Sequence, residues 1–178
     1  MDKIDLKQIC NYLDEVNWHY LLIEQENLIL TGWRARVPHY SCSMPVEIWL
    51  SRHWVVIQGV ILKRVPAEQQ LSVLTLLSSL NQGCRQARYF VEDHRVILQT
   101  EVSIVRCNAN SFWEALENIC RNFNASGPEI SVVATNPSVG NLLKRTTSDL
   151  TPNIREGESD EDERLTKFQF AINSLRTT

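Results

Sequence analysis

Arginine and tryptophan residues recur between Leu28 and Arg64, and of all the side chains in the chain they are the best suited to bind a ligand. Arg34 and Arg36 stand two residues apart in a strand-like segment, so both point to one face while Trp33 points to the other. A guanidinium group binds phosphate through two parallel hydrogen bonds and stacks on flat rings. The stretch therefore predicts a site for a planar, anionic ligand, formed by Trp33, Arg34, Arg36, Arg52 and Trp54.

A purely structural role is the alternative for the same side chains. Tryptophans on strands commonly pack in a core, and arginines at strand ends are commonly solvated charges. The residue types leave both interpretations open.

Composition and motifs exclude several classes of protein. The balance of 18 basic against 21 acidic residues, a net charge of −3, argues against a broad nucleic-acid-binding face. No phosphate loop, G-x-S-x-G or H-E-x-x-H motif is present, so we expect a binding protein and not an enzyme. The five scattered cysteines have no zinc-site spacing, and no apolar run reaches the length of a membrane span. We therefore expect a cytoplasmic protein without a metal or a cofactor.

The elements that must position these residues follow from periodicity. Helical spacing predicts helices over residues 2–16, 66–83 and 111–123, the last starting with a capping box from Ser111 to Glu114 and stopping near Asn124–Pro128. Alternation predicts strands over residues 18–24, 28–36, 46–51, 54–62, 86–91 and 96–105, with Trp54–Leu62 central and Tyr40–Ser43 a loop. The order predicts an α+β fold, in which an antiparallel sheet carries its helices mainly on one face.

Composition changes after Gly127. Residues 1–127 are expected to form the folded domain. Residues 128–178 are rich in polar and then acidic residues and predict a flexible acidic tail, although Ile130–Ala134 could still add a short strand. Apolar residues from Leu165 to Leu175 recover helical spacing, which predicts a terminal amphipathic helix.

Four segments stand out: Trp54–Gln58 leading to Pro66, the helix end Leu80–Asn81, Ala87–Val102 and Phe112–Leu116. They resemble the YbjN family, which shares its fold with the small chaperones of type III secretion, and the hairpin from Phe90 to Val102 is the most specific part. The resemblance covers roughly residues 1 to 125 and implies a type III secretion chaperone-like fold.

Within that family, the extra tryptophans, the segment Gly32–Arg36 and the polar tail resemble the cyanobacterial branch of CdgR-like cyclic di-GMP receptors. This resemblance implies a homodimer that binds cyclic di-GMP and signals by contact with a transcription factor. The signature of PilZ-type receptors is absent, so the five site residues rest on chemistry and strand placement. The loop Val37–Ser43 or the tail would then respond to the ligand. The alternative function is a ligand-free adaptor or chaperone-like protein-interaction module.

Overall fold

The computed structural model describes residues 4–37, 40–84 and 86–136. Its elements are built on a six-stranded antiparallel sheet whose strand order is β1-β2-β3-β4-β6-β5. The strands are β1 (Leu21–Ile23), β2 (Leu28–Val37), β3 (Tyr40–Leu50), β4 (Trp54–Leu62), β5 (Arg88–Glu92) and β6 (Arg95–Ser103). The helices are α1 (Leu6–Glu15), α2 (Gln70–Gly83) and α3 (Ala109–Thr135), with single 3-10 turns at η1 (Glu24–Glu26) and η2 (Ala67–Gln69). The predicted α+β fold is confirmed.

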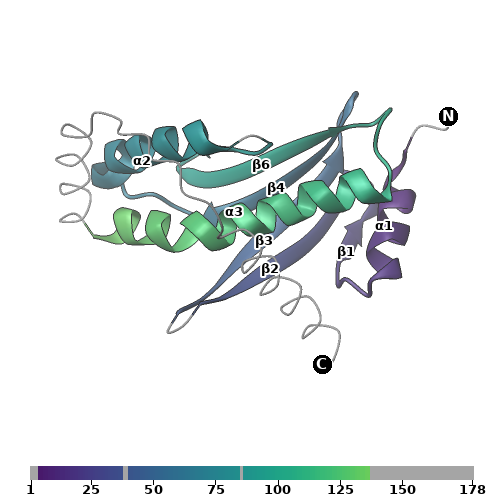
Figure 1. The fold of residues 1–178 in the computed structure, drawn as a ribbon, viewed down its shortest axis with the longest axis horizontal. Helices are drawn as coiled ribbons and strands as arrows, with labels where there is room; N and C mark the ends of the chain where they lie inside the picture. The colour runs from purple at the N-terminus through teal and green to yellow at the C-terminus, as the bar shows by residue number, and fades with distance from the viewer. Residues whose placement is uncertain (1–3, 38–39, 85, 137–178) are drawn as a thin grey trace, which may run out of the picture. The chain divides into compact units, whose positions relative to one another are not determined.

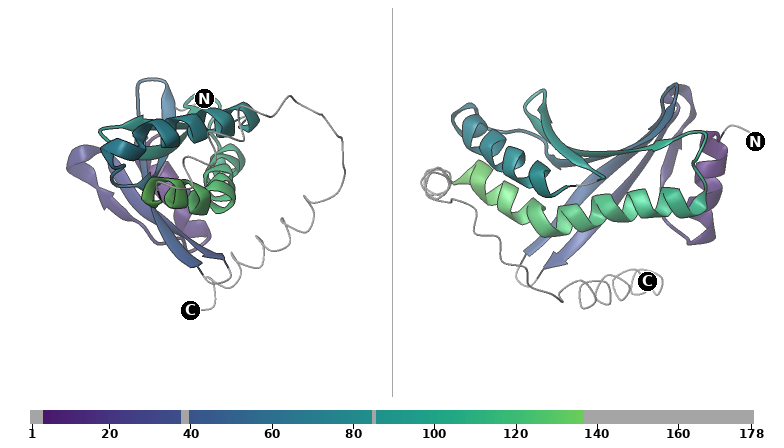
Figure 2. Two further views of the ribbon diagram at one scale, coloured as in Figure 1. Left: turned by 90° about the vertical axis from the view of Figure 1, so that its left-hand side faces the viewer. Right: turned by 45° about the horizontal axis from the view of Figure 1, so that its top comes forward.

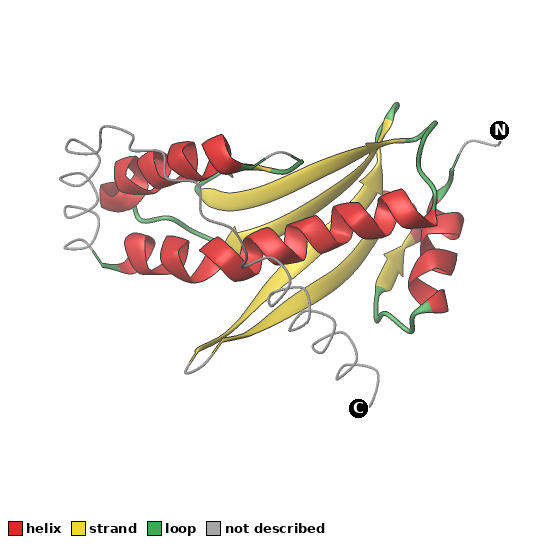
Figure 3. Ribbon diagram, viewed as in Figure 1, coloured by secondary structure: helices red, strands yellow, loops and turns green. Residues whose placement is uncertain are grey.

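The helices lie mainly on one face of the sheet, as predicted (Figure 3). In the right-hand view of Figure 2, α3 runs along the sheet, and it contacts β2, β4 and β6. Its buried stripe includes Phe112, Leu116 and Phe123, which are at most 2% exposed. We call this side of the sheet the helix face and the opposite side the open face.

Strand β4 is central, as predicted. It is paired with β3 on one side and β6 on the other, and seven of its nine residues are buried. A strand with both neighbours present and both sides shielded favours a continuous apolar run over alternation. The polar exception is Gln58, which is 6% exposed.

The hairpin between β5 and β6 is confirmed. Asp93 and His94 occupy the turn with φ of 48° and 63°, the left-handed conformation that suits a two-residue hairpin. Asp5 caps α1, its side chain accepting a hydrogen bond of 2.8 Å from the amide of Gln8.

Two strand predictions were wrong. Tyr40–Ser43 is not a loop, because β3 begins at Tyr40 and pairs with β2 from the Val37–Tyr40 pair onward. The first strand is shorter than expected and starts at Leu21, because Trp18 instead donates a side-chain hydrogen bond of 2.7 Å to Thr31 Oγ1.

The predictions for the third helix were also wrong at both ends. Its N-cap is Asn108, whose side chain and the hydroxyl of Ser111 accept hydrogen bonds from each other's amides, so the capping box lies one turn before the predicted one. The helix continues to Thr135, which replaces the predicted stop at Asn124–Pro128 and the short strand.

Burial explains why α3 continues through Gly127 and Pro128. An internal proline removes one helical hydrogen bond and costs about 3 kcal/mol. The next turns bury Ile130, Val133 and Ala134, each at most 2% exposed, which offsets that cost. Gly127 lies so close to Phe123 that a Cβ atom would stand 2.7 Å from the ring. The division at residue 127 stays a prediction. Residues 137–178, including the predicted terminal helix, lie outside the described residues.

Candidate binding face

Trp33 lies on the helix face and is 3% exposed. Its indole N–H donates a hydrogen bond of 2.9 Å to Asn124 Oδ1 on α3, and its ring stacks on Trp18 with centroids 5.9 Å apart. The side chain therefore joins the sheet to α3 and to the segment that follows α1. It does not provide the exposed ligand wall that we expected from the sequence.

The other predicted site residues are spread along the open face and its turns. Arg34 is exposed on β2 opposite Ser43, and the backbone of Arg36 pairs with Ser41; the side chain of Arg36 lies outside the described part of the structure. Arg52 is exposed in the turn between β3 and β4, and Trp54 is 44% exposed at the start of β4.

The register separates these residues into two groups. Arg34 pairs with Ser43, whereas Val55, next to Trp54, pairs with Leu50. Ser43 and Leu50 are seven residues apart on β3, which corresponds to about 24 Å along the strand. The structure brings Arg34 near the backbone of Arg36 and Arg52 near Trp54, but it does not bring the two pairs into one cluster.

The open face carries mainly apolar side chains, which are exposed at Leu21 and Trp54 and almost fully buried at Val56, Val60 and Ile97. Alternation along each paired strand places one set of side chains there, and the helices of the described residues lie mainly on the opposite side. Leu21 is 62% and Trp54 is 44% exposed, whereas their apolar neighbours are half-buried or buried. The apolar residues of this face are Leu21, Ile23, Leu28, Leu30, Trp49, Trp54, Val56, Val60, Phe90 and Ile97.

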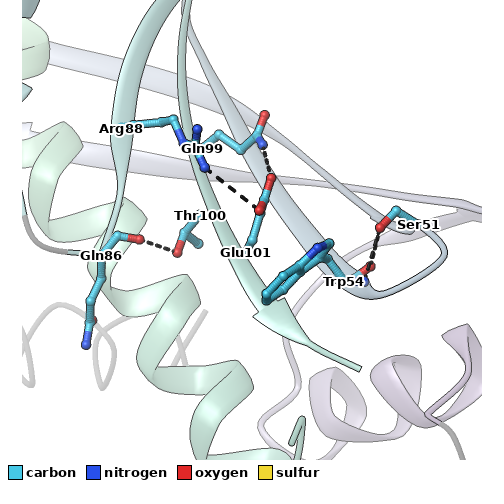
Figure 4. A network of polar contacts seen from close by, with 7 residues as sticks. All are labelled: Ser51, Trp54, Gln86, Arg88, Gln99, Thr100 and Glu101. Carbon is cyan, nitrogen blue, oxygen red and sulfur yellow. Dashed lines mark hydrogen bonds and ion pairs between the residues drawn. The ribbon is translucent and has the colours of Figure 1, made fainter. Parts of the chain in front are cut away.

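A line of polar side chains crosses the middle of this apolar surface. Glu47 pairs with Gln58, Gln58 with Gln99, and Gln99 with Arg88, so that four neighbouring strands each contribute one residue. We call Glu47, Gln58, Gln99 and Arg88 the polar row. Figure 4 shows one end of it, where Gln99 donates a hydrogen bond of 2.8 Å to Glu101 and Arg88 lies 3.9 Å from the same carboxylate.

The polar row was missed in the sequence analysis. The signal that could have found it is Gln58 itself, a primary amide in the middle of the apolar run Trp54–Leu62. Glu47 and Gln99 occupy alternating strand positions and look like ordinary solvated residues until the register places them beside Gln58.

The helix side holds a second polar group, around Tyr89 on β5. The Tyr89 hydroxyl donates to the carbonyl of Asn122 at 3.1 Å and lies 2.5 Å from Ser126 Oγ, and the Cys84 thiol lies 3.1 Å from Asn122 Oδ1. Burial raises the pKa of Tyr89 to about 12 and raises the pKa of Cys84 as well. Both groups are therefore protonated at neutral pH, and the cluster joins β5 to α3 without an activated nucleophile.

Metal chemistry and membrane insertion find no support in the described residues. They contain no group of three or more histidine, cysteine and acidic side chains close enough to hold a metal ion. None of their helices combines the length and the apolar character needed to cross a bilayer.

Comparison with known proteins finds likeness in structure only. No family model and no curated protein matches the sequence. The solved structure of YbjN from E. coli matches with a TM-score of 0.53 and 13% identity, over 72% of this chain and 96% of that chain.

Two complexes give lower scores. The ExsC–ExsE complex has a TM-score of 0.49 and 11% identity over 70% of this chain and 96% of that one. The ExoU–SpcU complex of the Pseudomonas aeruginosa type III secretion system has a TM-score of 0.46 and 13% identity over 71% of this chain and 97% of that one. The match to YbjN, with its TM-score of 0.53, confirms the fold expected from the resemblance, and this chain has a YbjN-like fold.

Proposed function

We propose that the chain is a non-catalytic protein-interaction module that holds a segment of another polypeptide on the open face of its sheet. The observation that supports this is the apolar surface itself, with Leu21 and Trp54 62% and 44% exposed on a sheet face without a helical cover among the described residues. Contiguous exposed apolar surface marks interaction sites, and tryptophan is enriched among the residues that dominate binding energy.

A polypeptide suits this surface better than a compact ligand does. The apolar side chains extend over strands β1 to β6, and the polar row interrupts them. An extended or helical segment can place apolar side chains on both sides of a polar contact, whereas a small ligand is usually enclosed by a concave pocket.

The experiment is a selection of displayed random dodecamer peptides against the purified protein. The enriched peptides are then tested against the double variant Leu21→Ser/Trp54→Ser. Leu71→Ser/Leu74→Ser is the matched control, because these α2 leucines are also exposed, by 65% and 45%, and lie outside the sheet. We expect the open-face variant to lose at least about tenfold in affinity and the control to stay within about twofold.

Equal effects of the two double variants would disprove the proposed face. The homodimer expected from the sequence is tested alongside, by light scattering of the wild type and both variants. A dimer that dissociates only in the Leu21→Ser/Trp54→Ser variant would make a second copy of this chain the occupant, and would overturn binding to a different polypeptide.

A second proposal concerns cyclic di-GMP. Arg34 is exposed on the open face, and the backbone of Arg36 follows two residues later on β2. A guanidinium group binds phosphate through paired hydrogen bonds. In this proposal the protein is a receptor that binds the dinucleotide near the β2–β3 end and passes the signal to a transcription factor.

Calorimetric titration with cyclic di-GMP tests the receptor proposal, with cyclic di-AMP and GTP as competitors for specificity. We expect Arg34→Ala and Arg36→Ala each to abolish the heat of binding. Arg52→Ala is the control, because the register separates Arg52 from Arg34. Absence of heat with the wild type, or an equal loss with Arg52→Ala, would rule out this site.

A further inference from the structure

Gln58 is the most unusual polar side chain of the open face. It lies on β4 between Val56 and Val60, which are 5% and 7% exposed, and is itself 6% exposed. Its amide forms no hydrogen bond with another described residue. Burial of a primary amide without a partner costs roughly 1–3 kcal/mol.

The amide of Gln58 nevertheless reaches the surface. Within the described residues, no side-chain nitrogen or oxygen is both inaccessible and without a hydrogen bond. Because Gln58 has no hydrogen bond there, its polar atoms must retain some accessible area. The side chain thus lies among apolar neighbours, and its amide keeps a small accessible area on the open face.

Glu47 stands opposite Gln58 on β3 and is half-buried. No lysine, arginine or histidine of the described residues forms an ion pair with it. The cation of the polar row, Arg88, lies instead beside Glu101, at 3.9 Å. A carboxylate and a carboxamide therefore stand as neighbours on this face, and the cation of the row, Arg88, lies beside Glu101 at its other end.

A flat ring completes this group. Trp49 follows Glu47 by two residues on the same strand face and pairs with Val56. Carboxylate, amide oxygen and indole together suit a guanidinium group, which donates paired hydrogen bonds and stacks on aromatic rings. A lysine ammonium satisfies the charge but not the planar geometry.

From this geometry we infer that the partner segment places a cationic side chain, by preference an arginine, on Glu47 and Gln58 beside Trp49, with apolar side chains on either side of it. This inference rests on the proposed function, because it names the chemistry of the polypeptide that the open face holds. Charge complementarity fixes the register of the segment, while the apolar surface supplies most of the affinity.

The test uses the same peptide selection and a double-mutant cycle. Enriched peptides should contain an arginine between apolar residues. Replacing that arginine by citrulline, which keeps the shape and removes the charge, should weaken binding roughly tenfold, as should Glu47→Gln in the protein. The citrulline peptide should bind the wild type and Glu47→Gln equally, because the lost interaction is the same one. Glu26→Gln, an exposed change on η1, is the control and should have no effect.

Two other readouts make the result decisive. Gln58→Leu should weaken the binding of the arginine peptide. The same variant should bind a peptide that carries norleucine in place of the arginine more tightly than the wild type does. Binding of the arginine peptide should decrease with salt more steeply than binding of the citrulline peptide.

The possible failures are distinguishable. Peptides that lose affinity for Leu21→Ser/Trp54→Ser but contain no basic residue, or that bind Glu47→Gln as well as wild type, would overturn the cationic contact and leave the proposed function in place. Peptides insensitive to Leu21→Ser/Trp54→Ser would overturn both.

Discussion

The two faces of the sheet treat the same kinds of side chain differently. On the helix face, Trp33 donates its indole N–H to Asn124, and Thr100 donates its hydroxyl to the carbonyl of Gln86. On the open face, Trp54 is 44% exposed, and the side-chain amide of Gln58 forms no hydrogen bond with the described residues. These polar side chains of the helix face are thus hydrogen-bonded within the described chain, whereas the open face has exposed apolar area at Trp54 and an amide without a hydrogen bond at Gln58. A face left incomplete in this way is the part of the fold available for binding.

The largest test of this comparison uses one tryptophan from each face. Trp33→Ala removes a buried ring and its hydrogen bond and should lower the free energy of unfolding by about 3–5 kcal/mol. Trp54→Ala removes a ring that is 44% exposed and should cost about 0.5–1 kcal/mol. Urea denaturation followed by circular dichroism measures both.

Binding should show the opposite order. Trp54→Ala should weaken a selected open-face peptide, while Trp33→Ala should leave the affinity of the folded fraction unchanged. If both tryptophan variants lose similar stability, the two faces are not distinct in the way that their burial indicates.

A smaller effect is expected at Tyr89, where the sheet joins α3. Tyr89→Phe removes the hydroxyl that contacts the Asn122 carbonyl and Ser126, and should cost about 1–2 kcal/mol at pH 8. Ser126 keeps its own hydrogen bond of 2.7 Å to the Asn122 carbonyl, which limits the loss. Denaturation of the wild type and the variant under identical conditions gives the difference.

The same pair of proteins gives a pH dependence with a defined sign. Burial raises the pKa of Tyr89 in the folded protein to about 12, above the ordinary value of about 10 that applies to the unfolded chain. The unfolded state therefore loses its Tyr89 proton first, and this group's contribution to stability is present below pH 10 and lost as the pH rises toward 12. The stability gap between wild type and Tyr89→Phe should narrow over that window. A constant gap would mean that the hydroxyl is not buried.

Local sequence signals predicted most of the fold. The apolar run Trp54–Leu62 identified the central strand, and the polar link between Val91 and Val96 identified the hairpin, because both depend on nearest neighbours. The end of the third helix was wrong because Gly127 and Pro128 are local helix breakers, whereas the burial of Ile130 and the residues after it is a tertiary effect.

The candidate site was less predictable because it depends on register. Alternation correctly separated Trp33 from Arg34, but it could not show that Trp33 packs against α3 or that Trp54 lies about 24 Å along the sheet from Arg34. The polar row has one member on each of four strands, and only the pairing brings them together. Nothing in the spacing of Glu47 and Gln58 along the chain indicates that they are neighbours.

The smallest expected changes in the free energy of unfolding come from two buried polar residues, one on each face. They also separate the two faces most sharply, because we expect them to differ in sign. Thr100→Val on the helix face removes a hydrogen bond of 2.6 Å and leaves the Gln86 carbonyl with one partner fewer, so it should cost about 1 kcal/mol. Gln58→Leu on the open face removes an amide without a hydrogen bond to the described residues and replaces it by an apolar side chain of similar size. It should be neutral or should stabilise the fold by up to about 1 kcal/mol.

If Thr100→Val lowers the free energy of unfolding and Gln58→Leu raises it, Gln58 is retained for binding at some expense of stability. A stabilising role for Gln58 predicts instead that both substitutions lower the free energy of unfolding. If Gln58→Leu destabilises the protein as much as Thr100→Val, the amide is satisfied within the fold and is not available as an acceptor for a partner. The urea midpoints decide between these outcomes only if the denaturant slopes of the two variants match the wild type, because equal slopes show that neither change alters the compactness of the folded or unfolded state.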